Sequence, residues 1–212
     1  MRIIAGQRRG HKIDGPRGSS TRPTSDLVRE SIFNILGEAV EGRVVLDLFA
    51  GTGALGLEAL SRGASRAIFV ERNRDNIGLI HRNVATLRYE GQCRVHLADA
   101  YRWALTYDPG SDDPVIVVID PPYRDYEIHQ KKVKRLLEHL TSSLPRGSAL
   151  ALESRARLDE DILPEEPLWD VRRYGGTQIA VRFLTSDPPP EAEEAAEGEV
   201  EDSGVEDVED PS

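Results

Sequence analysis

Residues 119 to 126, IDPPYRDY, place an acid, two prolines and an aromatic ring directly after an apolar run. Proline fixes φ and has no N–H, so the Pro-Pro pair is expected to keep the chain extended and to leave both proline carbonyls free of local helical bonding. The carbonyl of Pro121 then stands beside the carboxylate of Asp120. These two acceptors can hold both hydrogens of one planar –NH2 group, and Tyr123 offers a ring on which a base can stack. Asp120, Pro121, Pro122 and Tyr123 therefore form a candidate catalytic site for an aromatic amine. The alternative is a strand that prolines merely terminate, with an accidental acid.

A glycine-rich stretch, DLFAGTGALG at residues 47 to 56, is the second candidate site. Gly51, Gly53 and Gly56 match G-x-G-x-x-G, in which glycines permit a tight turn and let a ligand approach the start of the following helix. The commonest functional interpretation is a dinucleotide site. A tight strand-to-helix turn without a ligand has the same pattern, so the motif alone does not distinguish a binding site from a structural turn.

Acidic residues stand at the ends of three successive apolar runs: Asp47, Glu71 and Asp99. Glu71 comes 24 residues after Asp47, close to the spacing at which an acid accepts hydrogen bonds from ribose hydroxyls. Asp99, followed by Ala100, is suited to accept a hydrogen bond from an adenine amine. Each acid taken singly has a simpler interpretation as a surface residue or a helix cap. Together they predict a ligand that contains a ribose.

The apolar runs predict strands, and helix-period stretches fill the gaps between them. Strands are expected at residues 43–49, 66–71, 93–98, 114–120 and 148–154. Their continuous apolar character favours a parallel sheet that is covered on both faces. Ligands of such sheets bind beyond the carboxyl ends of the strands, which is where the candidate residues lie.

The segments before and after residues 43–154 do not follow this alternation of strands and helices. Before it, apolar residues recur at helical spacing over residues 27–36, and Thr24 or Ser25 can cap that helix. After it, residues 168–183 contain two β-rich runs around a Gly-Gly pair, with no room for a crossover helix, which predicts an antiparallel hairpin. The expected fold is α/β: a doubly wound, mostly parallel, seven-stranded Rossmann-like sheet with an antiparallel edge hairpin and a small N-terminal extension.

The net charge of −10 is unevenly distributed. Residues 185–212 contain 12 acidic and no basic residues, which leaves 25 acidic against 27 basic residues in residues 1–184. This tail has almost no large apolar residues and is expected to be disordered. Residues 1–35 contain seven basic against three acidic side chains, which is either a patch for phosphates or an ordinary solvated surface.

Three segments are expected: a basic, RNA-facing segment and helix over residues 1–40, the main domain over residues 41–184, and the acidic tail over residues 185–212. No apolar run approaches the roughly 18 residues of a membrane span, and the N-terminus lacks the apolar stretch of a secretory signal. We therefore expect a cytoplasmic protein without a membrane partner. The single Cys93 is expected to be a small buried hydrophobe, and the five histidines show no metal spacing.

The combination of DLFAGTG and DPPY resembles the class I S-adenosylmethionine-dependent methyltransferases that alkylate exocyclic amines of nucleobases. More narrowly, the chain is similar to the RsmD family in four ordered stretches: RPTSDLVRESIFNIL (22–36), LDLFAGTGALGLEALSRGA (46–64), VER (70–72) and DPPY (120–123). The similarity covers roughly residues 1–184, and the acidic tail departs from the compact pattern of the family. The resemblance implies methylation of guanine N2 in 16S ribosomal RNA.

The resemblance also implies roles for individual residues. S-adenosylmethionine would be the donor, S-adenosylhomocysteine the product, and no metal would take part. The donor would lie against Asp47, Ala50, Gly51, Thr52, Gly53, Glu71, Arg72, Asp99 and Ala100. RNA would contact Arg8, Arg9, Lys12, Arg22, Thr24 and Arg29, which would guide phosphates toward the mouth of the site. The partner would be 16S ribosomal RNA or the small ribosomal subunit, and the protein a monomer.

The chemistry of the transfer follows from the same residues. The exocyclic nitrogen of guanine is a poor nucleophile because its lone pair is delocalised into the ring. Asp120 and the carbonyl of Pro121 would orient this nitrogen and stabilise its developing positive charge. Asp120 is also placed to receive the proton, and Tyr123 would stack on the base after it leaves its helix.

Three other functions fit part of the sequence. An NAD-dependent dehydrogenase would use the glycines and Glu71, but it leaves DPPY without a task and lacks an obvious proton-transfer His or Lys. A non-catalytic RNA-binding assembly factor would use the basic N-terminus. A methyltransferase for another amine, such as adenine N6 in DNA or RNA, is equally compatible with DPPY, because the motif recognises an –NH2 group and not guanine as such.

Overall fold

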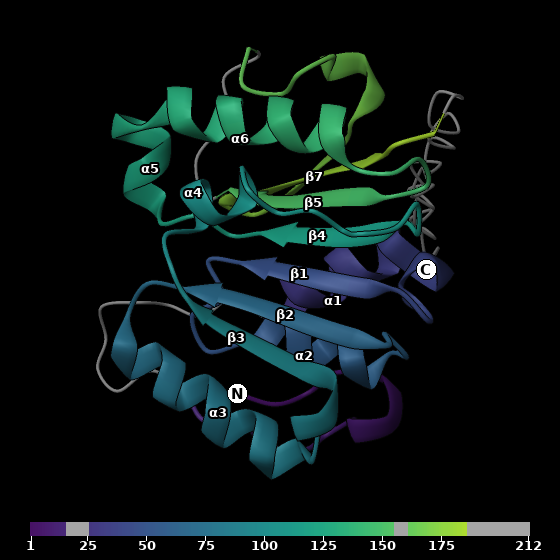
Figure 1. Ribbon diagram of the computed structural model, residues 1–212, viewed down its shortest axis with the longest axis vertical. Coiled ribbons are helices and arrows are strands. Elements are labelled where there is room, and N and C mark those ends of the chain that lie inside the picture. Colours follow the sequence, from purple (N-terminus) through teal and green to yellow (C-terminus); the bar gives the residue numbers. More distant parts are fainter. Residues whose placement is uncertain (16–25, 155–160, 186–212) are drawn as a thin grey trace, which may run out of the picture.

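The computed structural model describes residues 1–15, 26–154 and 161–185 of the chain, and its centre is one seven-stranded sheet (Figure 1). The strands are β1 (Val44–Leu48), β2 (Arg66–Glu71), β3 (Cys93–Leu97), β4 (Val115–Ile119), β5 (Ala149–Ser154), β6 (Asp170–Tyr174) and β7 (Thr177–Phe183). Their order is β3-β2-β1-β4-β5-β7-β6. The first five strands are parallel, and β7 runs antiparallel to both β5 and β6. The predicted doubly wound sheet with an antiparallel edge hairpin is confirmed.

The predicted strands match the observed ones to within one residue at each end for all five parallel strands. The hairpin turns at Gly175, whose φ of 59° lies in the left-handed region that glycine adopts without strain. Tyr174 and Thr177 pair directly across that turn, as a two-residue hairpin loop requires.

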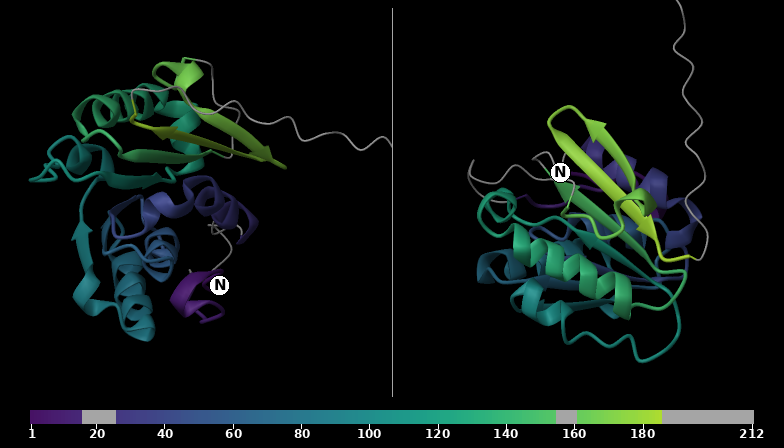
Figure 2. Two further views of the ribbon diagram at one scale, coloured as in Figure 1. Left: turned by 90° about the vertical axis from the view of Figure 1, so that its right-hand side faces the viewer. Right: turned by 90° about the horizontal axis from the view of Figure 1, so that it is seen from above.

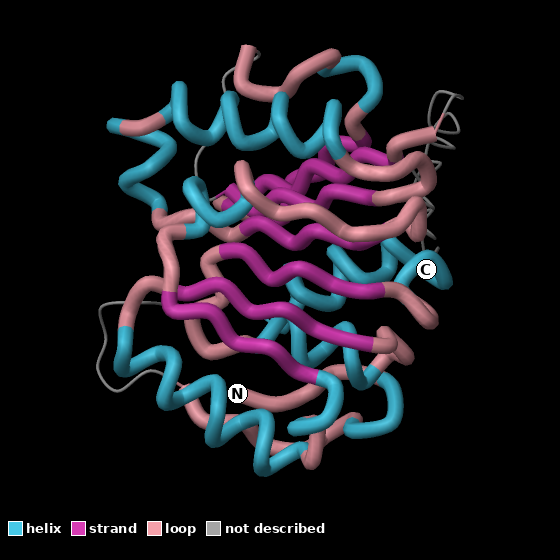
Figure 3. Tube along the Cα trace, in the orientation of Figure 1, coloured by secondary structure: helices cyan, strands magenta, loops and turns pink. Residues whose placement is uncertain are grey.

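Within the described residues, six α-helices cover the sheet: α1 (Asp26–Leu36), α2 (Ala54–Ser61), α3 (Arg74–Leu87), α4 (Ala100–Ala104), α5 (Tyr123–Ile128) and α6 (Gln130–Ser143). Short 3-10 turns lie at η1 (Gly6–Arg8), η2 (Gly37–Val40), η3 (Glu90–Gln92) and η4 (Glu166–Leu168). Helices α1, α2 and α3 pack in one hydrophobic core, and α4, α5 and α6 pack in another on the opposite face. Figures 2 and 3 show the twisted sheet between these two layers.

Strand β1 contributes side chains to both cores. Val45 belongs to the core with α1 to α3, whereas Leu46 and Leu48 belong to the core with α4 to α6, because successive side chains point to opposite faces. Cys93, expected to be a buried hydrophobe, is half-buried and packs against the first core. Burial raises the pKa of its thiol to about 12.

The connection order creates a switch point between β1 and β4. From β1 the chain moves outward through β2 to β3 and then returns to the other side of β1 as β4, where Leu48 lies beside Ile119. A crevice at the carboxyl ends of the strands is expected where the strand order reverses in this way. The segments that follow β1 and β4, residues 49–53 and 120–123, are the two candidate sites.

The chain before α1 contains an element that the sequence did not indicate, a hairpin that lies against α2 and α3. We call residues 1–14 the N-terminal hairpin. Arg2 and Lys12 form an antiparallel bridge, and the N–H of Ile3 donates to the carbonyl of His11 at 3.0 Å. Ile3 and Ile13 are buried in the core. The predicted N-terminal extension is therefore a packed part of the fold.

Glu58 of α2 fastens this hairpin to the domain. Its fully buried carboxylate accepts hydrogen bonds from the N–H groups of Ile4 (2.8 Å) and Ala5 (3.0 Å) and from Nε of Arg62 (2.8 Å). Nε of Arg29, also fully buried, lies 3.7 Å from Glu58 Oε2. A buried carboxylate is tolerated when it is paired and hydrogen-bonded as Glu58 is.

We predict that Gly6→Ala lowers the free energy of unfolding much more than Gly10→Ala. Both glycines have φ near +80° in the same hairpin, at 77° and 81°. A Cβ on Gly6 would lie 1.8 Å from the backbone oxygen of Ser61, whereas a Cβ on Gly10 meets nothing within 4 Å. The left-handed conformation costs either alanine about 1–2 kcal/mol, and the clash at residue 6 adds about 1–3 kcal/mol. Urea denaturation of the two variants measures this, and equal losses would contradict the packing of the hairpin on α2.

Helix α1 begins at Asp26 among the described residues. The expected caps Thr24 and Ser25, and nearly all of the acidic tail, lie outside the described residues. None of the helices in the described part of the chain combines the length and apolar character that crossing a membrane requires.

Candidate active site

The loop after β1 has an unusual backbone. Phe49, Gly51 and Gly53 all have positive φ, at 66°, 54° and 78°. Glycine adopts this region freely, but Phe49 does so at a cost, and such strained residues concentrate at functional sites. The N–H of Gly53 donates to the carbonyl of Ala50 at 2.7 Å, and that of Ala50 to the carbonyl of Val70 at 3.0 Å, so the loop is tightly turned and tied to β2.

Asp47 acts on this loop through the backbone. Its Oδ2 accepts a hydrogen bond from the N–H of Gly56 at 2.8 Å, and its side chain is buried. A Cβ on Gly56 would lie 2.4 Å from Cε1 of Phe69 and 3.1 Å from Asp47 Oδ2. The third glycine of the motif is therefore required for close packing of α2 on β2, while Gly51 and Gly53 shape the turn.

Glu71 connects the first and second strand ends. Its Oε2 accepts from the N–H of Gly51 at 2.8 Å, and its Oε1 accepts from the N–H of Asn73 at 2.7 Å. Each carboxylate oxygen has a second lone pair, so Glu71 can still accept from a ligand hydroxyl. Asn73 in turn caps α3 by accepting from the N–H groups of Asp75 and Asn76. The acid predicted to bind a ribose thus also holds the glycine loop.

At the third strand end, Asp99 caps α4. Its Oδ1 accepts from the N–H of Arg102 at 3.0 Å, which is the helix-cap alternative expected for this residue. Ala100 behind it is buried, and Arg72 on the neighbouring strand end is exposed. The N–H of Ala98 donates to the carbonyl of Glu71 at 3.0 Å, so the second and third strand ends lie side by side.

The DPPY turn begins beside the end of β1. The N–H of Asp120 donates to the carbonyl of Leu48 at 3.5 Å, and Pro121 is buried. Pro122 has the extended conformation, with φ −54° and ψ 139°. Its carbonyl accepts from the N–H of Asp125 at 2.8 Å, so the expectation that both proline carbonyls avoid local helical bonding is wrong for Pro122. Tyr123 is 49% exposed, as a ring that stacks on a base must be.

Residues that the sequence did not indicate support this turn from behind. The hydroxyl of Tyr101 donates to Oδ2 of the buried Asp125 at 2.9 Å, and its ring meets Phe49 edge-on with centroids 4.9 Å apart. The hydroxyl of Tyr126 donates to the carbonyl of Glu153 at 2.6 Å. Burial raises the pKa of both tyrosines, so each remains a hydrogen-bond donor at neutral pH. The loop after β1, α4 and α5 are thereby joined.

Acidic side chains gather at the carboxyl ends of β1, β2 and β4 and make this edge of the sheet electrostatically negative. Burial raises the pKa of Asp47 well above its usual range, the N–H of Gly56 opposes this, and repulsion from Asp120 and Glu71 adds to it. The three carboxyl groups therefore act on one another across the ends of β1, β2 and β4. A cation placed among them relieves that repulsion. Among the described residues, no group of three or more His, Cys, Asp and Glu side chains stands close enough to hold a metal ion.

Asn83 links the loop to the N-terminal hairpin. Its side chain is buried on α3, where Oδ1 accepts from the N–H of Asp14 at 2.7 Å. Its Nδ2 donates to the carbonyls of Asp14 (3.1 Å) and Thr52 (3.0 Å). The hydroxyl of Thr52 also lies 4.0 Å from the sulfur of Met1. The glycine loop is therefore fixed from α3 and from the hairpin at the same residue.

The basic residues expected to bind RNA fall into three groups. Arg29 is fully buried, where it donates to the carbonyl of Arg2 and pairs with Asp26, so the expectation that it guides phosphates is wrong. Arg22 and Thr24 lie outside the described residues. Arg8, Arg9 and Lys12 belong to the N-terminal hairpin.

The tip of that hairpin, at Arg8 and Arg9, lies far from the DPPY turn, where the substrate is expected to enter. The N–H of Arg8 donates to Oγ of Ser61, and its Nε to the carbonyl of Leu87. Ser61 and Leu87 end α2 and α3, both of which start at the carboxyl edge of the sheet and run back across it. Arg8 and Arg9 are therefore at the opposite edge from the DPPY turn.

Comparisons with known proteins match most of the chain. The family model described as "Conserved hypothetical protein 95" matches residues 1–183. "Ribosomal RNA small subunit methyltransferase D" of Escherichia coli strain K12 is 34% identical over 198 residues, or 91% of this chain and 93% of that protein. "Putative rRNA methyltransferase YlbH" of Bacillus subtilis is 40% identical over 137 residues, or 65% of this chain and 72% of that protein. The solved structure of "Putative methyltransferase yhhF" from Escherichia coli has a TM-score of 0.69 at 33% identity and covers 87% of this chain and 99% of its own.

Proposed function

Because this chain belongs to the family of conserved hypothetical protein 95, the family of the methyltransferase relatives described above, we propose that it is an S-adenosylmethionine-dependent ribosomal RNA methyltransferase. The proposed target is the exocyclic N2 amine of a guanine in 16S ribosomal RNA. One observation carries the proposal: the amine-accepting DPPY turn starts within hydrogen-bond reach of Leu48, the residue directly before the glycine loop. A cofactor held by that loop is therefore next to an amine held by that turn.

The residues at this edge suit S-adenosylmethionine. When bound, the donor supplies an electrophilic methyl group on a positively charged sulfur, which matches the negative edge around Asp47, Glu71 and Asp120. Glu71 would accept from the ribose hydroxyls, and Asp99 with Ala100 would face the adenine. The methionine end would lie along the turn formed by Ala50, Gly51, Thr52 and Gly53, with Asp47 acting through the loop backbone and Arg72 at the rim.

The work of the protein is to orient the amine. Asp120 and the carbonyl of Pro121 would accept hydrogen bonds from the two N–H groups and so aim the nitrogen lone pair at the methyl group. Acceptors held in advance stabilise the positive charge that develops on nitrogen and need no reorganisation during the reaction. Alignment of nitrogen, methyl carbon and sulfur contributes several kcal/mol more, on the order of what oriented binding supplies elsewhere. Asp120 would then take the proton.

The substrate base must leave its stack before it can reach this turn. Tyr123 is half-exposed beside Asp120, and a base stacked on an aromatic ring gains about 1–3 kcal/mol. Pro122 fixes the direction of the chain into α5. We propose 16S ribosomal RNA or the small ribosomal subunit as the partner, S-adenosylhomocysteine as the product, and a cytoplasmic monomer as the acting form.

We predict that Asn83→Asp weakens S-adenosylmethionine binding about tenfold, because the carboxylate loses the donors to the carbonyls of Thr52 and Asp14 and a lost hydrogen bond of a buried group costs about 1–3 kcal/mol. Isothermal titration with the donor measures the affinity. Val84→Ala, at the next buried position of α3, is the control for a general loss of stability. If both variants bind the donor equally at matched stability, Asn83 does not position the loop.

Nucleoside analysis tests the proposed reaction. The purified chain, methyl-labelled donor and unmodified 16S ribosomal RNA or small subunits are incubated, and the RNA is digested to nucleosides for mass spectrometry. We expect label in N2-methylguanosine. Label in N6-methyladenosine would assign the other amine, and absence of any labelled nucleoside from both substrates would contradict the proposal.

A further inference from the structure

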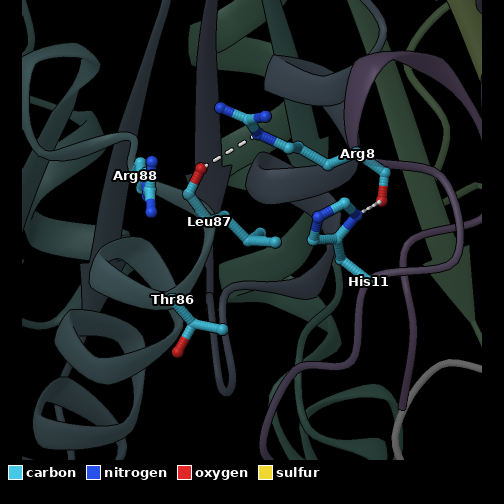
Figure 4. A pocket seen from close by; sticks show the side chains of 5 residues that line it. All are labelled: Arg8, His11, Thr86, Leu87 and Arg88. Carbon is cyan, nitrogen blue, oxygen red and sulfur yellow. Dashed lines mark hydrogen bonds between the residues drawn. The ribbon is translucent and has the colours of Figure 1, made fainter.

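A pocket of about 280 Å³ lies where the tip of the N-terminal hairpin meets the end of α3 (Figure 4). It is lined by Arg8, His11, Thr86, Leu87 and Arg88. Two of these side chains are permanently cationic, a third can become so, and none is acidic. The lining comes from two segments almost eighty residues apart in the sequence, so the charges are gathered by folding.

Arg8 is held rigidly in this pocket. Its N–H donates to Oγ of Ser61 at 2.9 Å, and its Nε donates to the carbonyl of Leu87 at 3.1 Å. The guanidinium carbon lies 5.5 Å from the centre of the Tyr89 ring, within the range of a cation–π contact. A positioned guanidinium loses little entropy when it binds an anion, because its side chain is already ordered.

His11 and Arg88 complete the lining. Nδ1 of His11 lies 3.0 Å from the carbonyl of Arg8. Since a carbonyl only accepts, Nδ1 carries the proton, and Figure 4 shows the other ring nitrogen on the side of Leu87. Arg88 is exposed and has the left-handed conformation, with φ 59° and ψ 49°.

The C-terminal end of a helix normally repels anions, but at the end of α3 basic side chains outweigh that repulsion. The carbonyls at the end of α3 are equivalent to about half a negative charge. Arg8 donates directly to one of them, that of Leu87, and Arg88 adds a second full positive charge. The pocket is therefore net positive.

The position of the pocket relates it to the proposed reaction. Helix α3 starts beside Glu71 and ends at the pocket, and its 14 residues correspond to about 21 Å at 1.5 Å per residue. The N-terminal hairpin contacts Thr52 and Asn83 beside the glycine loop with one end, and Ser61 and Leu87 beside the pocket with the other. A ligand that reaches both places is long and negatively charged.

We propose that this pocket binds a phosphodiester group of the RNA backbone several nucleotides away from the methylated base. The inference rests on the proposed function, because it takes RNA as the substrate, and it adds a second contact at the edge of the sheet opposite the DPPY turn. The pocket fixes how the RNA lies across the α2 and α3 face. It also gives Arg8 a role at the edge opposite the mouth.

Arg88→Gly separates this role from capping of α3. Glycine adopts the left-handed conformation more readily than arginine, so the variant should be at least as stable as the wild type if the helix end is all that matters. We expect its affinity for 16S ribosomal RNA transcribed in vitro to fall about three- to tenfold at 0.1 M salt. The slope of log K against log salt should decrease by roughly 0.7–0.9, the value for one lost phosphate contact. Arg88→Lys should restore most of the affinity.

Arg135→Gln is the matched control, since Arg135 is an exposed arginine of α6, which packs against the opposite face of the sheet. Filter binding over a series of salt concentrations measures all four proteins, and titration with S-adenosylmethionine should give one donor affinity for all of them. RNA binding by Arg88→Gly equal to that of the wild type or of Arg135→Gln overturns the proposal. If RNA binds through the pocket but the wild type transfers no methyl group, the proposed reaction fails and the pocket stands.

Discussion

Asp120→Ala should reduce methyl transfer at least about 1,000-fold while leaving the affinity for S-adenosylmethionine within about twofold. Removal of one preorganised group that stabilises developing charge typically costs 10² to 10³ in rate, and Asp120 would in addition orient the nitrogen and take its proton. In the proposed arrangement the loop after β1 and Glu71 supply most of the contacts to the donor, and Asp120 is one of three acids near its sulfur, so loss of this one carboxylate should change the affinity little. Single-turnover transfer to 16S ribosomal RNA and titration with the donor measure the two quantities.

Two further variants make this result specific. Asp120→Asn keeps the shape and one acceptor but loses the negative charge, so we expect an intermediate rate. Asp113→Ala removes an exposed acid near the start of β4, at the other end of the strand, and should transfer at the wild-type rate. Wild-type transfer by Asp120→Ala would remove the residue from the mechanism.

Glu71→Ala should weaken S-adenosylmethionine binding roughly 100-fold. The variant loses the hydrogen bonds from the N–H groups of Gly51 and Asn73, at 2.8 and 2.7 Å, and with them the acceptor proposed for the ribose. Hydrogen bonds to charged groups contribute about 1.5–3 kcal/mol each, and freeing the glycine loop adds a cost of ordering it on binding. Isothermal titration with donor and product measures the affinity.

The control for Glu71 is Glu90→Ala, which removes an exposed acid from η3 and should leave the affinity unchanged. Glu71→Gln should lie between the two, because its amide oxygen can accept one N–H while its NH2 group faces the other donor. Donor binding by Glu71→Ala at wild-type strength would show that neither the ribose contact nor the loop depends on this residue.

The sheet and the strand-end residues were predictable because both depend on local pattern. Continuous apolar runs gave the five parallel strands to within one residue, and the Gly-Gly pair located the edge hairpin. In a parallel sheet the carboxyl ends share one edge, so Asp47, Glu71, Asp99 and Asp120 could be grouped without knowledge of the structure.

The contacts around those residues were not predictable because they join distant segments. No local signal marks Phe49 for a positive φ, or pairs Tyr101 with Asp125, 24 residues further along the chain. Arg29 shows the limit most clearly. Its charge suggested a phosphate contact, but Arg29 is buried and pairs with Glu58 and Asp26, and charge patterning alone does not identify the partner of a basic side chain.

The N-terminal hairpin was missed for a similar reason. It is held by a single isolated bridge, which leaves no alternating pattern in the sequence, and its packing depends on Gly6 approaching the backbone of Ser61 and on the buried carboxylate of Glu58. Only the basic character of the segment was visible in the sequence. The fold converts that character into a fixed arrangement, with one end of the hairpin at the glycine loop and the other at the pocket formed by Arg8, His11 and Arg88.

A crystal structure of the complex with S-adenosylhomocysteine tests the central claim most directly. We predict that the nucleoside lies across the ends of β1, β2 and β3, with its ribose on Glu71, and that its sulfur faces the carboxylate of Asp120 with room for one amine nitrogen between them. A nucleoside bound elsewhere, or Asp120 turned away from the sulfur, would contradict the proposal that donor and amine meet at this edge of the sheet.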